Sequence, residues 1–113
     1  MIQIYHNPRC SKSREGLAIV EASGKDFEII HYMKEPPEAE DLKKVILTLK
    51  MNPIDLVRKN EPIWKEIYED KFLNDQQIIA AMVLHPQLIE RPIVINGENA
   101  VIGRPPELIK DIL

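Results

Sequence analysis

The sequence predicts an α/β fold with a mixed sheet, in which a βαβ unit and a ββα unit enclose a helical region. Short apolar stretches rich in β-branched residues alternate with helical periodicity near both ends of the chain. A hairpin signal, "NGEN" at residues 96–99, joins two such stretches. The length of 113 residues fits one domain.

The first third of the chain predicts a strand, a helix and a second strand. Residues 2–5, "IQIY", alternate in polarity and predict a strand. A helical pattern begins at about Ser11, and Gly24 is a typical residue to end it. Residues 27–32, "FEIIHY", predict the second strand. A helical crossover of this kind joins parallel strands.

The middle of the chain predicts only helices. They are a helix opened by Pro36 and Pro37 with an apolar stripe over residues 42–49, short helices over 53–69 broken at Pro62, and a helix that Asn74 or Asp75 caps and Pro86 ends. This is more helix than a minimal domain of this kind needs. We therefore interpret about residues 37–86 as an inserted helical region.

The last part of the chain predicts an antiparallel hairpin and a helix. Residues 93–95 and 100–102 flank the hairpin signal, and Pro105 and Pro106 are expected to begin the final helix. Its apolar side is expected to carry Leu108, Ile109, Ile112 and Leu113. The order βαβ…ββα around a mixed sheet is the thioredoxin-like arrangement, predicted here as a single domain over residues 1–113.

Composition excludes several classes of function. The net charge of −3 gives no basic face for nucleic acid. The longest apolar run, "IIAAMVL", has seven residues, so we expect no membrane span. The N-terminus lacks a charged region leading into an apolar stretch, so we expect no signal peptide and a cytoplasmic location. His6, His31 and His85 lack zinc-ligand spacing, and there is one cysteine.

That cysteine, Cys10, lies in "HNPRCSKSR", residues 6–14, which holds three cations and no acid. It falls where the first strand gives way to the first helix, and the unpaired N–H groups of a helix N-terminus favour an anion. Such a setting can lower a cysteine pKa from ~8.5 to roughly 3.5–7.5. The same helix end suits a phosphate-like anion. The stretch therefore predicts a nucleophile and an oxyanion pocket in one place.

An alternative is that Cys10 is a small buried packing residue. The neighbours Pro8, Arg9, Ser11 and Lys12 are unusual around such a cysteine. His6 could stabilise a thiolate, or could be only a polar residue at a strand end. Ser13 occupies the second position of a C-x-x-C motif, so any disulfide must form with another molecule.

Three arginines elsewhere could complete an oxyanion pocket. Arg58 lies in "LVRKN", Arg91 precedes Pro92, and Arg104 lies in "GRPP". Guanidinium groups suit tetrahedral oxyanions because they give paired, charge-assisted hydrogen bonds. Taken alone, each arginine is more often a surface charge than a ligand. The Arg91–Pro92 bond is expected to be cis, as the corresponding bond commonly is in thioredoxin-like folds.

Four motifs carry a family resemblance. "IYHNPRCSKSR", "LVRKN", "HPQLIERPIVI" and "IGRPPE" occur in the order seen in the glutaredoxin-coupled arsenate reductases, and the match runs essentially end to end. The resemblance implies that Cys10 attacks arsenate, that Arg58, Arg91 and Arg104 bind the oxyanion, and that His6 helps the thiolate form. We include Ser11 among the substrate-binding residues.

The resemblance also implies the source of electrons. Glutathione would be the co-substrate and glutaredoxin the partner, with As(V) reduced to As(III) and no bound metal or organic cofactor. Two alternatives stay open. One is a glutathione- or glutaredoxin-linked thiol oxidoreductase with another substrate. The other is a non-enzymatic Spx-type transcription regulator, although these usually carry C-x-x-C and lack the "LVRKN" match.

Overall fold

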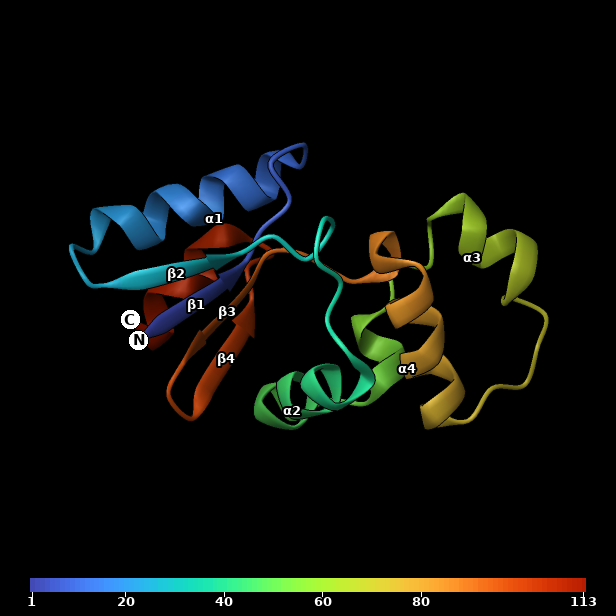
Figure 1. Ribbon diagram of the computed structural model, residues 1–113. Helices are drawn as coiled ribbons and strands as arrows, with labels where there is room; N and C mark the ends of the chain where they lie inside the picture. Colours follow the sequence, from blue (N-terminus) through green and yellow to red (C-terminus); the bar gives the residue numbers. More distant parts are fainter. The chain divides into compact units, whose positions relative to one another are not determined.

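The computed structural model describes all 113 residues, which form two compact units. The first unit joins residues 1–35 to residues 91–113, and the second contains residues 36–90 (Figure 1). The helical insertion expected at about residues 37–86 thus falls within the second unit. That the whole chain behaves as a single domain stays a prediction.

The first unit is built on a four-stranded sheet in the order β2-β1-β3-β4 (Figure 1). Its strands are β1 (Ile2–Tyr5), β2 (Phe27–Ile30), β3 (Ile93–Asn96) and β4 (Asn99–Ile102). The pair β1 and β2 is parallel, whereas β1–β3 and β3–β4 are antiparallel. In the central strand, Ile4 lies between Ile29 and Val94. The predicted α/β class, thioredoxin-like with a mixed sheet, is confirmed.

Two helical elements complete the first unit. They are α1 (Ser11–Ala22) and a 3₁₀ helix, η3 (Pro106–Ile112), which contact each other. The buried core consists of Ile2, Ile4, Val20, Val94 and Ile109. Each apolar side chain of this size contributes roughly 1.5–3 kcal/mol when fully buried. Packing of this core holds α1 against the sheet. Cys10 therefore lies in the loop between the carboxyl end of β1 and the first residue of α1.

The second unit contains only helices. They are α2 (Ala39–Leu49), η1 (Pro53–Leu56), α3 (Pro62–Ile67), α4 (Asp75–Leu84) and η2 (Pro86–Leu88). α4 contacts α2, η1 and η2. As one of the two expected caps, Asn74 begins α4, and its side chain accepts a hydrogen bond of 2.9 Å from the Gln77 N–H. No helix in either unit combines the length and apolar character needed to span a membrane.

Three elements differ from those expected in ways that have a physical cause. β2 ends at Ile30 rather than residue 32, because the N–H groups of Lys34 and Glu35 both donate to the His31 carbonyl and close a turn. α2 begins at Ala39, after both prolines, because the Glu38 N–H donates to the Asp41 carboxylate and sets the helix start there.

The last helix is the third difference. It is a 3₁₀ helix, in which residues three apart share a side. Ile109 is therefore buried with Ile112 partly buried beside it, whereas Leu108 is exposed. The expected apolar face was wrong at Leu108 for this reason.

Candidate active site

Cys10 is the N-cap residue of α1, with an extended backbone (φ −97°, ψ 124°). Its N–H donates to the Asn7 carbonyl at 3.0 Å, and its own carbonyl accepts from the Arg14 N–H at 3.0 Å. The turn thus holds both backbone groups of the cysteine. Its thiol is half-buried and not in a disulfide. The position at the helix start agrees with the one that the sequence predicts.

The surroundings of the sulfur favour the thiolate. Burial raises the pKa of Cys10, but the Ser13 N–H, the Arg91 guanidinium and the Lys12 N–H outweigh it, and the net pKa is lowered. Two of these donors are unpaired N–H groups of the first turn of α1, which point toward the helix start. A larger share of thiolate makes Cys10 a better nucleophile near neutral pH.

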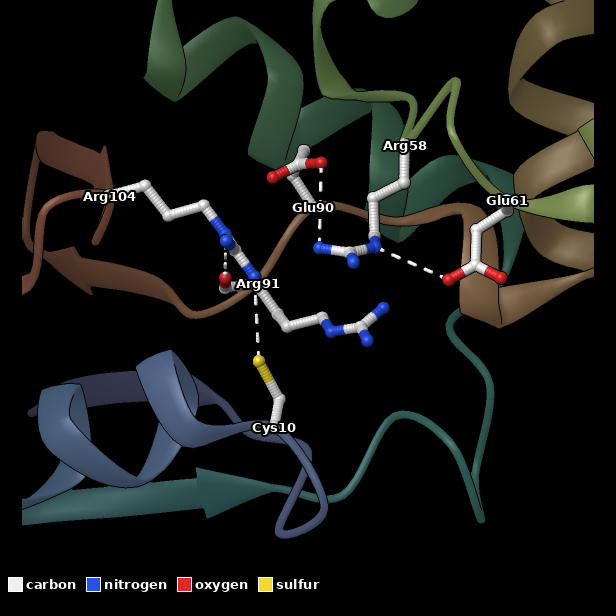
Figure 2. Close-up of polar contacts among 6 residues, drawn as sticks. All are labelled: Cys10, Arg58, Glu61, Glu90, Arg91 and Arg104. Atoms are coloured by element: carbon white, nitrogen blue, oxygen red, sulfur yellow. Dashed lines mark hydrogen bonds and ion pairs between the residues drawn. The ribbon is translucent and has the colours of Figure 1, made fainter.

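Two of the three predicted arginines lie at the sulfur. The Arg104 Nη2 atom donates to the Cys10 sulfur at 3.4 Å, and its Nε donates to the Arg91 carbonyl at 2.8 Å (Figure 2). The Arg91 guanidinium is near enough to the sulfur to lower the pKa of Cys10. Because the second contact fixes the Arg104 guanidinium on the Arg91 backbone, the two arginines form one cationic group beside the thiol.

Glycine permits the close packing behind these arginines. A Cβ on Gly16 would lie 2.8 Å from Pro92 Cγ, and one on Gly103 would lie 2.9 Å from the same atom. The Gly103 N–H donates to the Pro92 carbonyl at 2.8 Å. The Arg91–Pro92 bond is cis, which confirms that prediction, and Arg104–Pro105 is cis as well.

His6 contacts Ser13. The His6 Nδ1 atom lies 2.7 Å from the Ser13 Oγ, which also accepts the Asn7 N–H at 2.9 Å. Burial lowers the pKa of His6, and the neighbouring His31 lowers it further. The lowered pKa favours a neutral His6, whose Nδ1 shares a hydrogen bond with the Ser13 hydroxyl. Its catalytic role stays a prediction.

Ser13 is the functional residue that the sequence analysis missed. It is fully buried, its N–H binds the sulfur, and its hydroxyl links His6 to Asn7. The sequence analysis considered Ser13 only as the residue that replaces a second cysteine. No pattern in the sequence indicated it, because its contacts with His6 and Asn7 form only on folding. Ser11, by contrast, is exposed on the first turn, and its role in binding substrate stays a prediction.

Arg58 belongs to the second unit and has two acidic neighbours. Its Nε lies 3.4 Å from Glu61 Oε1, and its Nη1 lies 3.7 Å from Glu90 Oε1 (Figure 2). Its N–H also donates to the Leu88 carbonyl at 2.7 Å. The two carboxylates hold the guanidinium in place and were not predicted, since Glu90 is distant in sequence. That Arg58 converges on Cys10 stays a prediction.

Comparison with known proteins identifies the family and several relatives of this chain. The model of the ArsC family matches residues 5–112. An arsenate reductase from Acidiphilium multivorum is 41% identical over 99% of this chain and 80% of its own length. The Escherichia coli (strain K12) protein YfgD, described as uncharacterized, is 42% identical over 99% of this chain and 96% of its own.

A solved structure is equally similar. The arsenate reductase from Vibrio cholerae is 44% identical, with a TM-score of 0.94 over 99% of this chain and 97% of that one. Both matches thus extend along nearly the whole length of this chain. The chain belongs to the ArsC family.

Proposed function

We propose that this protein reduces arsenate to arsenite through a covalent sulfur–arsenic bond at Cys10, with glutathione and glutaredoxin as the sources of electrons. The observation that carries the proposal is the Cys10 sulfur, which accepts a hydrogen bond from the Arg104 guanidinium and whose pKa is lowered in part by the neighbouring Arg91. Such a site can hold a tetrahedral oxyanion against a nucleophile. Membership of the ArsC family, with arsenate reductases among its relatives, supports arsenate as that oxyanion.

In the first step, the Cys10 thiolate attacks arsenic. A sulfur–arsenic bond forms, one arsenate oxygen leaves as water after taking up two protons, and arsenic stays As(V). Arg91 and Arg104 offset the negative charge on the remaining oxygens, and Arg58 is proposed as the third such cation. The exposed hydroxyl of Ser11, on the first turn of α1, is proposed as a further donor to the oxyanion.

In the second step, a glutathione thiolate attacks the Cys10 sulfur. The sulfur–arsenic bond breaks with its electron pair left on arsenic, so As(V) becomes As(III) and leaves as arsenite. Cys10 and glutathione are now joined as a mixed disulfide. A glutaredoxin thiolate attacks the glutathione sulfur and releases Cys10. Because the chain has one cysteine, both electron-donating thiols besides Cys10 come from outside. Reduced glutathione fits a cytoplasmic location, which we also propose.

The test is NADPH oxidation driven by arsenate in the presence of glutathione, glutaredoxin and glutathione reductase, with each component omitted in turn. Cys10→Ser should be inactive, because a hydroxyl is a far weaker nucleophile at neutral pH. Lys110→Ala, an exposed change on η3, is the control. Steady turnover by the serine variant, or with thioredoxin replacing glutathione and glutaredoxin, would contradict the mechanism. Turnover of another substrate, or tight binding to RNA polymerase without turnover, would favour the two alternative functions instead.

A further inference from the structure

A cavity of about 280 Å³ opens in the first unit beside the loop that carries Cys10. Residues 6–9, which follow β1, form one wall, and His31, Met33 and Lys34, which follow β2, form the other. Small-molecule sites usually have volumes of ~300–1,000 Å³. This cavity is therefore suited to a small molecule or to part of a short peptide.

The cavity is cationic although the protein is acidic. Arg9 and Lys34 are exposed at its edge and take part in none of the ion pairs of the chain. No aspartate or glutamate lines it, whereas the chain carries a net charge of −3. His6, whose pKa burial lowers, is neutral near pH 7 and adds no charge. Two cations without acidic partners favour a ligand with two negative groups.

The cavity wall and the nucleophile share one hydrogen-bonded turn. Asn7 lines the cavity, and its carbonyl accepts the Cys10 N–H at 3.0 Å. Its side-chain oxygen accepts the Arg9 N–H at 3.0 Å, which fixes the backbone of Arg9, the residue before Cys10. A ligand that binds Arg9 therefore contacts the turn whose Asn7 carbonyl holds the N–H of Cys10.

We propose that this cavity binds the external thiol, a short peptide with two carboxylates, and that glutathione is the physiological one. The inference rests on the proposed function, because that function requires an outside thiol at Cys10. Arg9 and Lys34 bind the two carboxylates, and the apolar surface of Pro8 and Met33 contacts the peptide's methylene groups. Binding makes and breaks no bond in the cavity itself. The glutathione sulfur reacts only at Cys10, in the step written above.

S-methylglutathione is the probe, because its thioether cannot attack Cys10 and binding is thereby separated from turnover. NMR titration should shift the amide signals of residues 6–9 and 31–34. Arg9→Ala and Lys34→Ala should each weaken binding by about 1.4- to 5-fold, as expected for one exposed ion pair, and the double variant by about 2- to 25-fold. Lys110→Ala removes an equal charge outside the cavity and should bind as the wild type does. Lys34→Arg should retain most of the affinity.

The outcomes separate this inference from the proposed function. Shifts at the cavity that are weakened in the double variant support it even if the protein reduces no arsenate. The protein could reduce arsenate with glutathione while the probe shifts signals elsewhere, or while the double variant binds the probe as the wild type does. Either result contradicts glutathione binding in the cavity and leaves the proposed function intact. If millimolar S-methylglutathione shifts no amide signal, glutathione binding in the cavity is contradicted as well. Equal displacement of the probe by inorganic sulfate would show a general anion site, which also contradicts it.

Discussion

The guanidinium of Arg104 lies between two parts of the site: its Nη2 contacts the Cys10 sulfur at 3.4 Å, and its Nε contacts the Arg91 carbonyl at 2.8 Å. Arg104 thus contacts the Cys10 sulfur while the backbone of Arg91 holds its guanidinium in place. A cation beside a thiolate stabilises the charged form, so its removal should raise the pKa of Cys10.

We therefore expect Arg104→Gln to move the alkylation of Cys10 to higher pH. The rate of reaction with iodoacetamide, followed against pH, should give a transition below ~8.5 in the wild type and a higher one in the variant. Arg104→Lys should raise the pKa of Cys10 less, because lysine keeps the positive charge but lacks the planar guanidinium that contacts the sulfur and the Arg91 carbonyl together. Lys110→Gln is the control for charge alone. A wild-type transition at or above ~8.5 would contradict an activated cysteine.

Ser13→Ala should destabilise the fold. The change removes the Oγ that accepts the Asn7 N–H at 2.9 Å in a fully buried place, and an unsatisfied buried donor costs about 1–3 kcal/mol. Urea unfolding measures the loss. Ser11→Ala, an exposed change two residues earlier in the same helix, should stay within about 0.5 kcal/mol. Equal effects of the two substitutions would show that the buried network contributes nothing.

His6 should make stability depend on pH. Its pKa is lowered in the folded state by burial and by His31, so near and below pH 6.5 the unfolded chain binds a proton more readily than the folded one. The contribution is complete above the unfolded value of ~6.5 and is lost as the pH falls through the lower folded value. Free energies of unfolding at pH 7.5 and at pH 5.5 should differ less in His6→Gln than in the wild type. His85→Gln, in the second unit, is the control. An imidazole of His6 that titrates above 6.5 by NMR would contradict this prediction.

Arg58→Ala should raise the KM for arsenate if Arg58 is the third oxyanion ligand. Loss of one charge-assisted contact to a bound anion costs roughly 1.5–3 kcal/mol, which corresponds to about a 10- to 150-fold rise. Lys59→Ala removes the adjacent exposed cation and should change the KM little. If both variants behave alike, Arg58 serves only to pair with Glu61 and Glu90.

Local patterns predicted most of the fold and part of the site. Alternation in residues 2–5 and the Gly97 turn define strands and a hairpin by short-range geometry, and the N-cap position of Cys10 follows from where the strand pattern ends. The turn at His31 and the 3₁₀ geometry of η3 depend on backbone hydrogen bonds that periodicity does not encode.

The contacts in the site that the sequence did not predict all form between residues brought together by folding. The importance of Ser13 follows from the contacts of its hydroxyl with His6 and Asn7 in the folded chain. The contact between Arg104 and the Arg91 carbonyl depends on the close packing of Pro92 against two glycines. Sequence identifies a residue type that can do chemistry. Which atom it bonds to depends on segments brought together by folding.

The split of the first unit between the two ends of the chain governs how the nucleophile matures during synthesis. Cys10 leaves the ribosome early, whereas Arg104, which contacts its sulfur, follows 94 residues later, and β1 lacks its partner β3 until residues 93–96 have been made. A chain that ends before residue 91 therefore carries Cys10 without Arg91 or Arg104, and one that ends between residues 91 and 103 lacks Arg104. The contact between Arg104 and the sulfur can therefore form only after residue 104 has been made, whereas the Ser13 and Lys12 N–H groups lie within three residues of Cys10.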